Sequence, residues 1–132
     1  MSDIFKNTKW KAYNFSECVP KISITENGIT FNKGCLQKLE NPEYVSILFN
    51  YDDKQMALVK SCKEQKSDYR VGFYKKGLVR EMTCVRLNKE NLIKQVEHMM
   101  NWELRKDAFR CDGVYIESDK AIIFSLSEAK RM

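Results

Sequence analysis

The feature that most constrains the fold is the alternation of apolar and polar residues on both sides of Asn27-Gly28. In ISITENGITF, residues 22–31, every second residue of each flank is apolar, which is the period of a half-buried strand. Asn and Gly both tolerate positive φ, and this pair between two alternating segments is a strong signal for a β-hairpin. The sequence therefore predicts an antiparallel hairpin over residues 21–32.

Three later segments predict further hairpins by the same alternation. The second covers residues 44–60 and turns at 52–54, and the third covers residues 69–87 and turns at Lys75-Lys76-Gly77. The fourth covers residues 109–126 and turns at Glu117-Ser118-Asp119-Lys120. Since hairpins make up most of the chain, we expect an antiparallel sheet.

Two helices are predicted between the hairpins. A short helix, over about 33–40, begins after Asn32 and ends before Asn41-Pro42, because the residue before proline disfavours helical geometry. A longer amphipathic helix, over about 89–104, begins after Asn88, and both asparagines are typical N-cap residues. The predicted fold is α+β, with antiparallel hairpins forming a small barrel or curved sheet in a single domain of residues 1–132.

An internal repeat is suggested by two short sequence matches that occur in the same order. Asn32-Lys33 and Asn88-Lys89 each follow a predicted strand and start a predicted helix, and Asp-Lys then recurs at a hairpin turn at 53–54 and 119–120. These matches predict a pseudo-two-fold repeat with halves 21–60 and 83–126. The chain would then be a monomer with pseudo-symmetry or a homodimer.

Composition and motifs exclude several classes of function. The five cysteines are scattered without a C-x-x-C pair, which favours reduced, structural cysteines over a metal site or a disulfide framework. No phosphate loop, zinc-protease motif or nucleophile elbow occurs, and the only histidine, His98, falls on the polar face of its predicted helix. We therefore expect a protein that is not an enzyme and that uses neither a cofactor nor a metal.

The location of the protein is predicted from segments that the sequence lacks. Its first fifteen residues contain no apolar core of signal-peptide length. No apolar run approaches the roughly 18 residues that span a bilayer. The sequence predicts a cytoplasmic protein without a membrane partner.

Residues 22–60 resemble a DNA-binding unit of the AbrB/SpoVT type. In that family a strand and a glycine-containing turn lead to a short helix, and a two-stranded return with an acidic turn follows. Residues 83–126 show the same order of elements more faintly. The resemblance implies DNA binding, and it implies swapped-hairpin homodimers, or a tandem copy that forms the same barrel within one chain. The family usually has Ile-Pro before the helix, where this chain has Phe31-Asn32.

Two functions from different classes follow from these observations. The net charge of +5 is compatible with a nucleic-acid-binding protein of regulator type. In that case basic residues at hairpin tips and helix starts hold phosphates, and they are Lys21, Lys33, Arg70, Lys75, Lys76, Arg80 and Lys89. The alternative is a protein-interaction module encoded by a phage or another mobile element, such as an inhibitor of a host or defence complex, without direct nucleic-acid binding. Converging lysines favour the first function, and an acidic or apolar patch favours the second.

Overall fold

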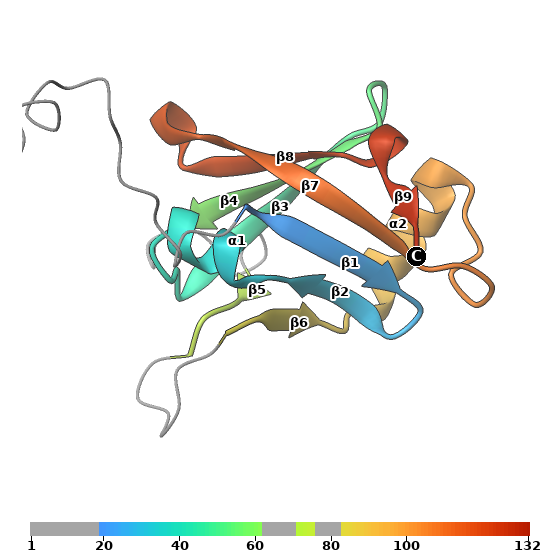
Figure 1. Cartoon of the computed structure of the whole chain (residues 1–132), viewed down its shortest axis with the longest axis horizontal. Coiled ribbons are helices and arrows are strands. Elements are labelled where there is room, and N and C mark those ends of the chain that lie inside the picture. The colour runs from blue at the N-terminus through green and yellow to red at the C-terminus, as the bar shows by residue number, and fades with distance from the viewer. Residues whose placement is uncertain (1–18, 62–70, 76–82) are drawn as a thin grey trace, which may run out of the picture.

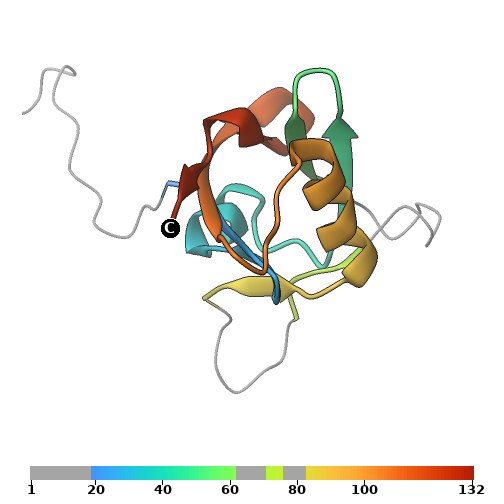
Figure 2. The same ribbon diagram turned by 90° about the vertical axis from the view of Figure 1, so that its right-hand side faces the viewer.

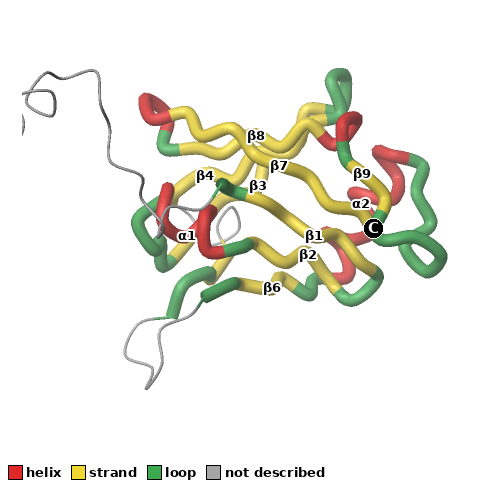
Figure 3. Tube along the Cα trace, in the orientation of Figure 1, coloured by secondary structure: helices red, strands yellow, loops and turns green. Residues whose placement is uncertain are grey.

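The computed structural model describes residues 19–61, 71–75 and 83–132, and within these ranges one antiparallel sheet curls around an apolar core (Figure 1). Its strands lie in the order β5-β3-β4-β8-β7-β1-β2-β6, and β9 pairs with β7. The predicted curved sheet is confirmed at this level, and strands outweigh helices (Figure 3). The strands are β1 (Lys21–Thr25), β2 (Gly28–Phe31), β3 (Tyr44–Asn50), β4 (Gln55–Ser61), β5 (Val71–Gly72), β6 (Val85–Leu87), β7 (Phe109–Ile116), β8 (Ala121–Ser125) and β9 (Lys130–Arg131).

Three of the four predicted hairpins are present in the structure. They are β1–β2, β3–β4 and β7–β8, and each is antiparallel. At the first turn Gly28 takes the positive φ, at 138°, whereas Asn27 does not. The turn between β7 and β8 contains a 3₁₀ helix, η3 (Glu117–Asp119), followed by Lys120 in left-handed geometry.

The third predicted hairpin, over residues 69–87, is not formed by the residues that the structure describes, and most of its turn and return, residues 76–82, lies outside them. Its two described strands pair with other parts of the chain, β5 with β3 and β6 with β2. These strands form the two ends of the sheet order. Val85 and Leu87 of β6 are buried opposite Phe31 and Ile29, so distant apolar contacts decide the pairing rather than proximity in sequence.

The short helix α1 (Lys33–Lys38) begins as predicted and ends two residues earlier than expected. The side chain of Asn32 accepts a hydrogen bond from the Cys35 amide at 3.2 Å and donates one to the Val19 carbonyl at 2.9 Å. Asn32 therefore caps the helix and also ties it to the chain entering β1. Burial raises the pKa of Cys35 to about 12, which keeps this thiol protonated and unreactive near neutral pH.

The second helix, α2 (Glu90–Met100), is shorter than the predicted range of 89–104. Its N-cap position is Lys89 rather than Asn88, and no side chain in the described part of the chain caps it. It ends because Asn101 adopts left-handed geometry, with φ of 57°, which asparagine tolerates better than most residues. The chain then turns back, and the Glu97 carboxylate accepts a hydrogen bond from the Leu104 amide at 3.0 Å.

The core lies inside the curl of the sheet, and α1 and α2 lie at opposite ends of it (Figures 1 and 2). Phe31 is fully buried, and its ring packs edge-on against Phe73 and Phe124, with centroid distances of 5.3 and 6.2 Å. The segment after α2 adds a stacked pair, Trp102 on Phe109, at 3.8 Å. Because the core fills the inside of the curl, the outer face of the sheet is the face on which we look for a binding site.

Candidate nucleic-acid interface

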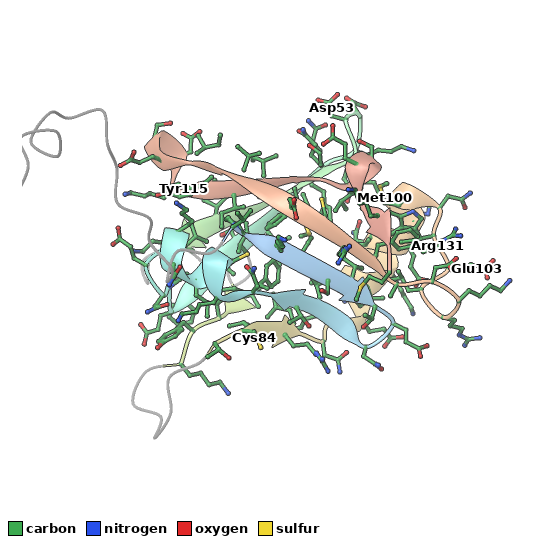
Figure 4. All side chains as sticks on the ribbon, in the orientation of Figure 1. Asp53, Cys84, Met100, Glu103, Tyr115 and Arg131 are labelled. Atoms are coloured by element: carbon green, nitrogen blue, oxygen red, sulfur yellow. The ribbon has the colours of Figure 1, made fainter. Side chains whose placement is uncertain are left out.

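A break in strand pairing opens a groove on the outer face of β7. β8 pairs with Gly113–Ile116 at one end of β7, and β9 pairs with Phe109 and Arg110 at the other. Between them the chain leaves the ladder as the 3₁₀ helix η4 (Leu126–Glu128). Figure 4 shows Arg131 and Tyr115 toward these two ends. Interruptions of a strand ladder redirect the side chains beside them. The groove at this interruption is lined by Lys21, Arg110, Cys111, Asp112, Glu128 and Lys130.

Five of the lining residues are charged and exposed, three of them basic and two acidic. Within the described ranges, none of the five forms an ion pair within 4.0 Å. Burial, and then the negative charges of Asp112 and Glu128, raise the pKa of Cys111 to about 11. Asp112 on β7 and Glu128 in η4 therefore both lie near this buried thiol, and the charges of the groove are available to a ligand.

A polar row extends from the groove across five strands. Successive cross-strand pairs place these residues side by side: Lys130 of β9, Arg110 of β7, Ser23 of β1, Thr30 of β2 and Arg86 of β6. Arg86 Nε donates a hydrogen bond to Thr30 Oγ1 at 3.2 Å. With strands about 4.8 Å apart, the row is roughly 19 Å long. It carries cations at both ends and hydroxyls in the middle.

The structure places the predicted phosphate contacts in different parts of the molecule. Lys21 lines the groove, and its amide donates to Asn32 Oδ1 at 3.0 Å, so Lys33, the next residue, lies at the same end of the sheet. Lys75 is exposed and follows Tyr74, whose amide bonds the Pro42 carbonyl at 2.9 Å.

Lys89 does not join these residues, because it begins α2 at the opposite end from α1 (Figure 1). Arg70, Lys76 and Arg80 lie outside the described residues. The seven residues therefore stay a prediction as a set, and only Lys21 belongs to the groove.

Sequence reasoning missed three basic residues of the row: Arg86, Arg110 and Lys130. A local signal existed for two of them, because Arg86 lies between Val85 and Leu87 and Arg110 lies between Phe109 and Cys111. This alternation predicts that they face outward. It does not predict that they lie in one row, which depends on the strand order and on β9.

Comparison with protein-family models, curated proteins and solved structures finds no match for this chain. The resemblance to AbrB/SpoVT units therefore stays a prediction. Among the described residues, no group of three His, Cys, Asp or Glu side chains is placed to hold a metal ion. No helix in the same ranges is long and apolar enough to cross a membrane.

Proposed function

We propose that this chain is a small, non-enzymatic nucleic-acid-binding protein of regulator type that acts in the cytoplasm. The observation that carries the proposal is the continuous outer-face surface formed by the groove and the polar row. Lys21, Arg110 and Lys130 lie together there, exposed and without an ion-pair partner among the described residues. Phosphate oxygens are the natural ligands of such cations, and counterion release makes these contacts favourable at low salt.

Binding is expected to be strongly salt-dependent. Anisotropy titrations of labelled 20-residue oligonucleotides should show micromolar affinity at about 50 mM salt and clear weakening by about 200 mM. The R110E/K130E variant should lose at least tenfold in affinity and flatten the slope of log K against log salt by about two units, since each phosphate contact contributes about 0.9.

The matched control is K94E/K106E, which makes the same change of charge in and just after α2. Lys94 and Lys106 are exposed there and pair with Glu90 and Glu103. The proposal is contradicted if folded protein at micromolar concentration binds neither DNA nor RNA at low salt. Equal losses in the two variants would show attraction by net charge instead of by this face.

We also propose that the chain arose by duplication of the halves 21–60 and 83–126. The alignment of Asp53-Lys54 with Asp119-Lys120 superposes the cross-strand pair Leu48–Ala57 on Val114–Ile123. Lys54 and Lys120 both have positive φ, at 54° and 50°.

The strands that join the two halves support the same relation. Met56 lies opposite Phe124, and Leu58 lies opposite Ile122, as a two-fold axis between β4 and β8 requires if Met56 corresponds to Ile122. The pairing of β2 with β6 is also two-fold symmetric: Ile29 lies opposite Leu87 and Phe31 lies opposite Val85. A monomer would already contain this pseudo-symmetry, and sedimentation equilibrium would distinguish it from a homodimer.

A second candidate function, a protein-interaction module, is favoured by an apolar row on another part of the sheet. Leu48, Ala57, Ile123 and Val114 lie side by side across β3, β4, β8 and β7. Leu48 and Val114 are 57% and 64% exposed. Contiguous exposed apolar residues are a feature of protein-binding surfaces.

This second candidate predicts that L48D/V114D removes a protein that co-purifies with the wild type in a fixed ratio, while R110E/K130E leaves it bound. The readout is the stoichiometry of the purified complex by native mass spectrometry. A complex that is lost only in R110E/K130E would contradict the assignment of the apolar row as the contact.

A further inference from the structure

The groove contains carboxylates where a surface that binds only phosphates would not be expected to have them. Asp112 lies directly opposite Lys21 in the β1–β7 ladder and two residues from Arg110 on the same face. Glu128 lines the groove from η4, close to Lys130. A carboxylate repels a phosphate at this range, so the two acidic residues weaken binding of any ligand that offers only negative charge.

We propose that the groove binds a ribose-phosphate backbone, so that RNA is preferred over DNA; the inference rests on the proposed function above. Lys21, Arg110 and Lys130 hold phosphates, and Asp112 and Glu128 accept hydrogen bonds from ribose 2′-hydroxyls. The 2′-hydroxyl is a donor that deoxyribose lacks, and it is the group by which a protein can distinguish RNA from DNA. An ionised carboxylate only accepts hydrogen bonds, so it is complementary to this donor.

The arrangement of the five groups places a hydrogen-bond acceptor next to a cation twice, as a backbone that carries both phosphates and hydroxyls requires. Directly opposed residues of an antiparallel pair have Cα atoms about 4.5–5.5 Å apart, which places Asp112 beside Lys21. On β7 the order Arg110, Cys111, Asp112 puts a cation and a carboxylate on one face with the buried thiol between them. Each carboxylate therefore lies next to a cation, Asp112 beside Lys21 and Glu128 two residues from Lys130, while the cations Arg110 and Lys130 are direct neighbours. None of the five is already paired within the described ranges.

The inference is tested with three single-stranded oligonucleotides of one sequence: RNA, DNA, and RNA with 2′-O-methyl groups. At about 50 mM salt the wild type should bind RNA roughly tenfold more tightly than DNA, as expected for a hydrogen bond to a charged acceptor. Methylation removes the donor and keeps the phosphates, so the methylated RNA should bind with the affinity of DNA.

Neutral replacements then assign the preference to the groove. D112N/E128Q should bring the affinities for RNA and DNA to within about twofold of each other, because the charge-assisted bonds are lost and the repulsion of DNA phosphates is relieved. The matched control is E117Q/D119N, which makes the same chemical changes in η3. It should keep the tenfold ratio.

The possible failures are distinguishable. Equal wild-type affinities for RNA and DNA, or methylated RNA that binds like RNA, would overturn the inference and leave the proposed function standing. No binding of any of the three ligands would remove both. If D112N/E128Q does not fold, which circular dichroism would show, the comparison of the three ligands with the wild type still decides.

Discussion

Replacing Phe31 by alanine is expected to lower the free energy of unfolding by about 3–5 kcal/mol. Phe31 has no exposed surface, and its ring contacts Phe73 and Phe124 at the centre of the core. Truncation removes buried apolar area, and it leaves a cavity that rigid strands on both sides cannot fill. Urea denaturation followed by tryptophan fluorescence or circular dichroism measures the change.

The control for this variant is Leu48→Ala, which also shortens an apolar side chain in a strand. Leu48 is 57% exposed on the outer face, so its truncation should change the stability by less than about 1 kcal/mol. A loss below about 1 kcal/mol for F31A, or equal losses for the two variants, would contradict the placement of Phe31 at the centre of the core.

Replacing Gly28 by alanine is expected to be almost as damaging, at about 2 kcal/mol or more. Gly28 has φ of 138°, and a Cβ there would lie 2.8 Å from the Leu87 carbonyl oxygen and 3.3 Å from Asn88 Cα. Both contacts are with backbone atoms, one in the last residue of β6 and one in the residue that follows it. The strain can therefore be relieved only by moving β6 away from Gly28. Thermal or urea unfolding of the variant gives the magnitude.

Gly72→Ala provides the matched control, because no atom of the described residues lies within 4 Å of a Cβ at that position. Its effect on stability should stay within about 0.5 kcal/mol. The close approach of β6 to Gly28 would be refuted by a G28A protein as stable as the wild type.

The local parts of the fold could be predicted from the sequence, and the non-local parts could not. Alternation and turn residues predicted three hairpins, and Asn32 caps its helix as expected. The prediction for the second helix was wrong at both ends, because Lys89 occupies the cap position and Asn101 turns left-handed. Asparagine suits a cap and a left-handed residue alike, so its presence alone does not distinguish a helix start from a helix end.

The candidate site was harder to predict, because it depends on which strands are neighbours. Lys21 was predicted as a phosphate contact. The residue that lies opposite it in the sheet, Asp112 of β7, is far away in sequence. The fourth predicted hairpin ends at Leu126, and no strand was predicted after it. In the structure the segment from Leu126 onward forms η4 and then β9, which brings Lys130 beside Arg110. Short strands of this kind carry too few residues to show a period.

The pairing of β9 has a consequence for the dynamics of the groove. One wall depends on a two-residue strand, held by the pairs Phe109–Arg131 and Arg110–Lys130 and by the hydrogen bond from the Met132 amide to the Ala108 carbonyl. So short a strand can detach at a free-energy cost well below that of global unfolding. Detachment would separate Lys130 from Lys21 and leave the buried core intact. A ligand that bridges these two residues would therefore hold β9 in place, and assembly of the groove would be coupled to its occupancy.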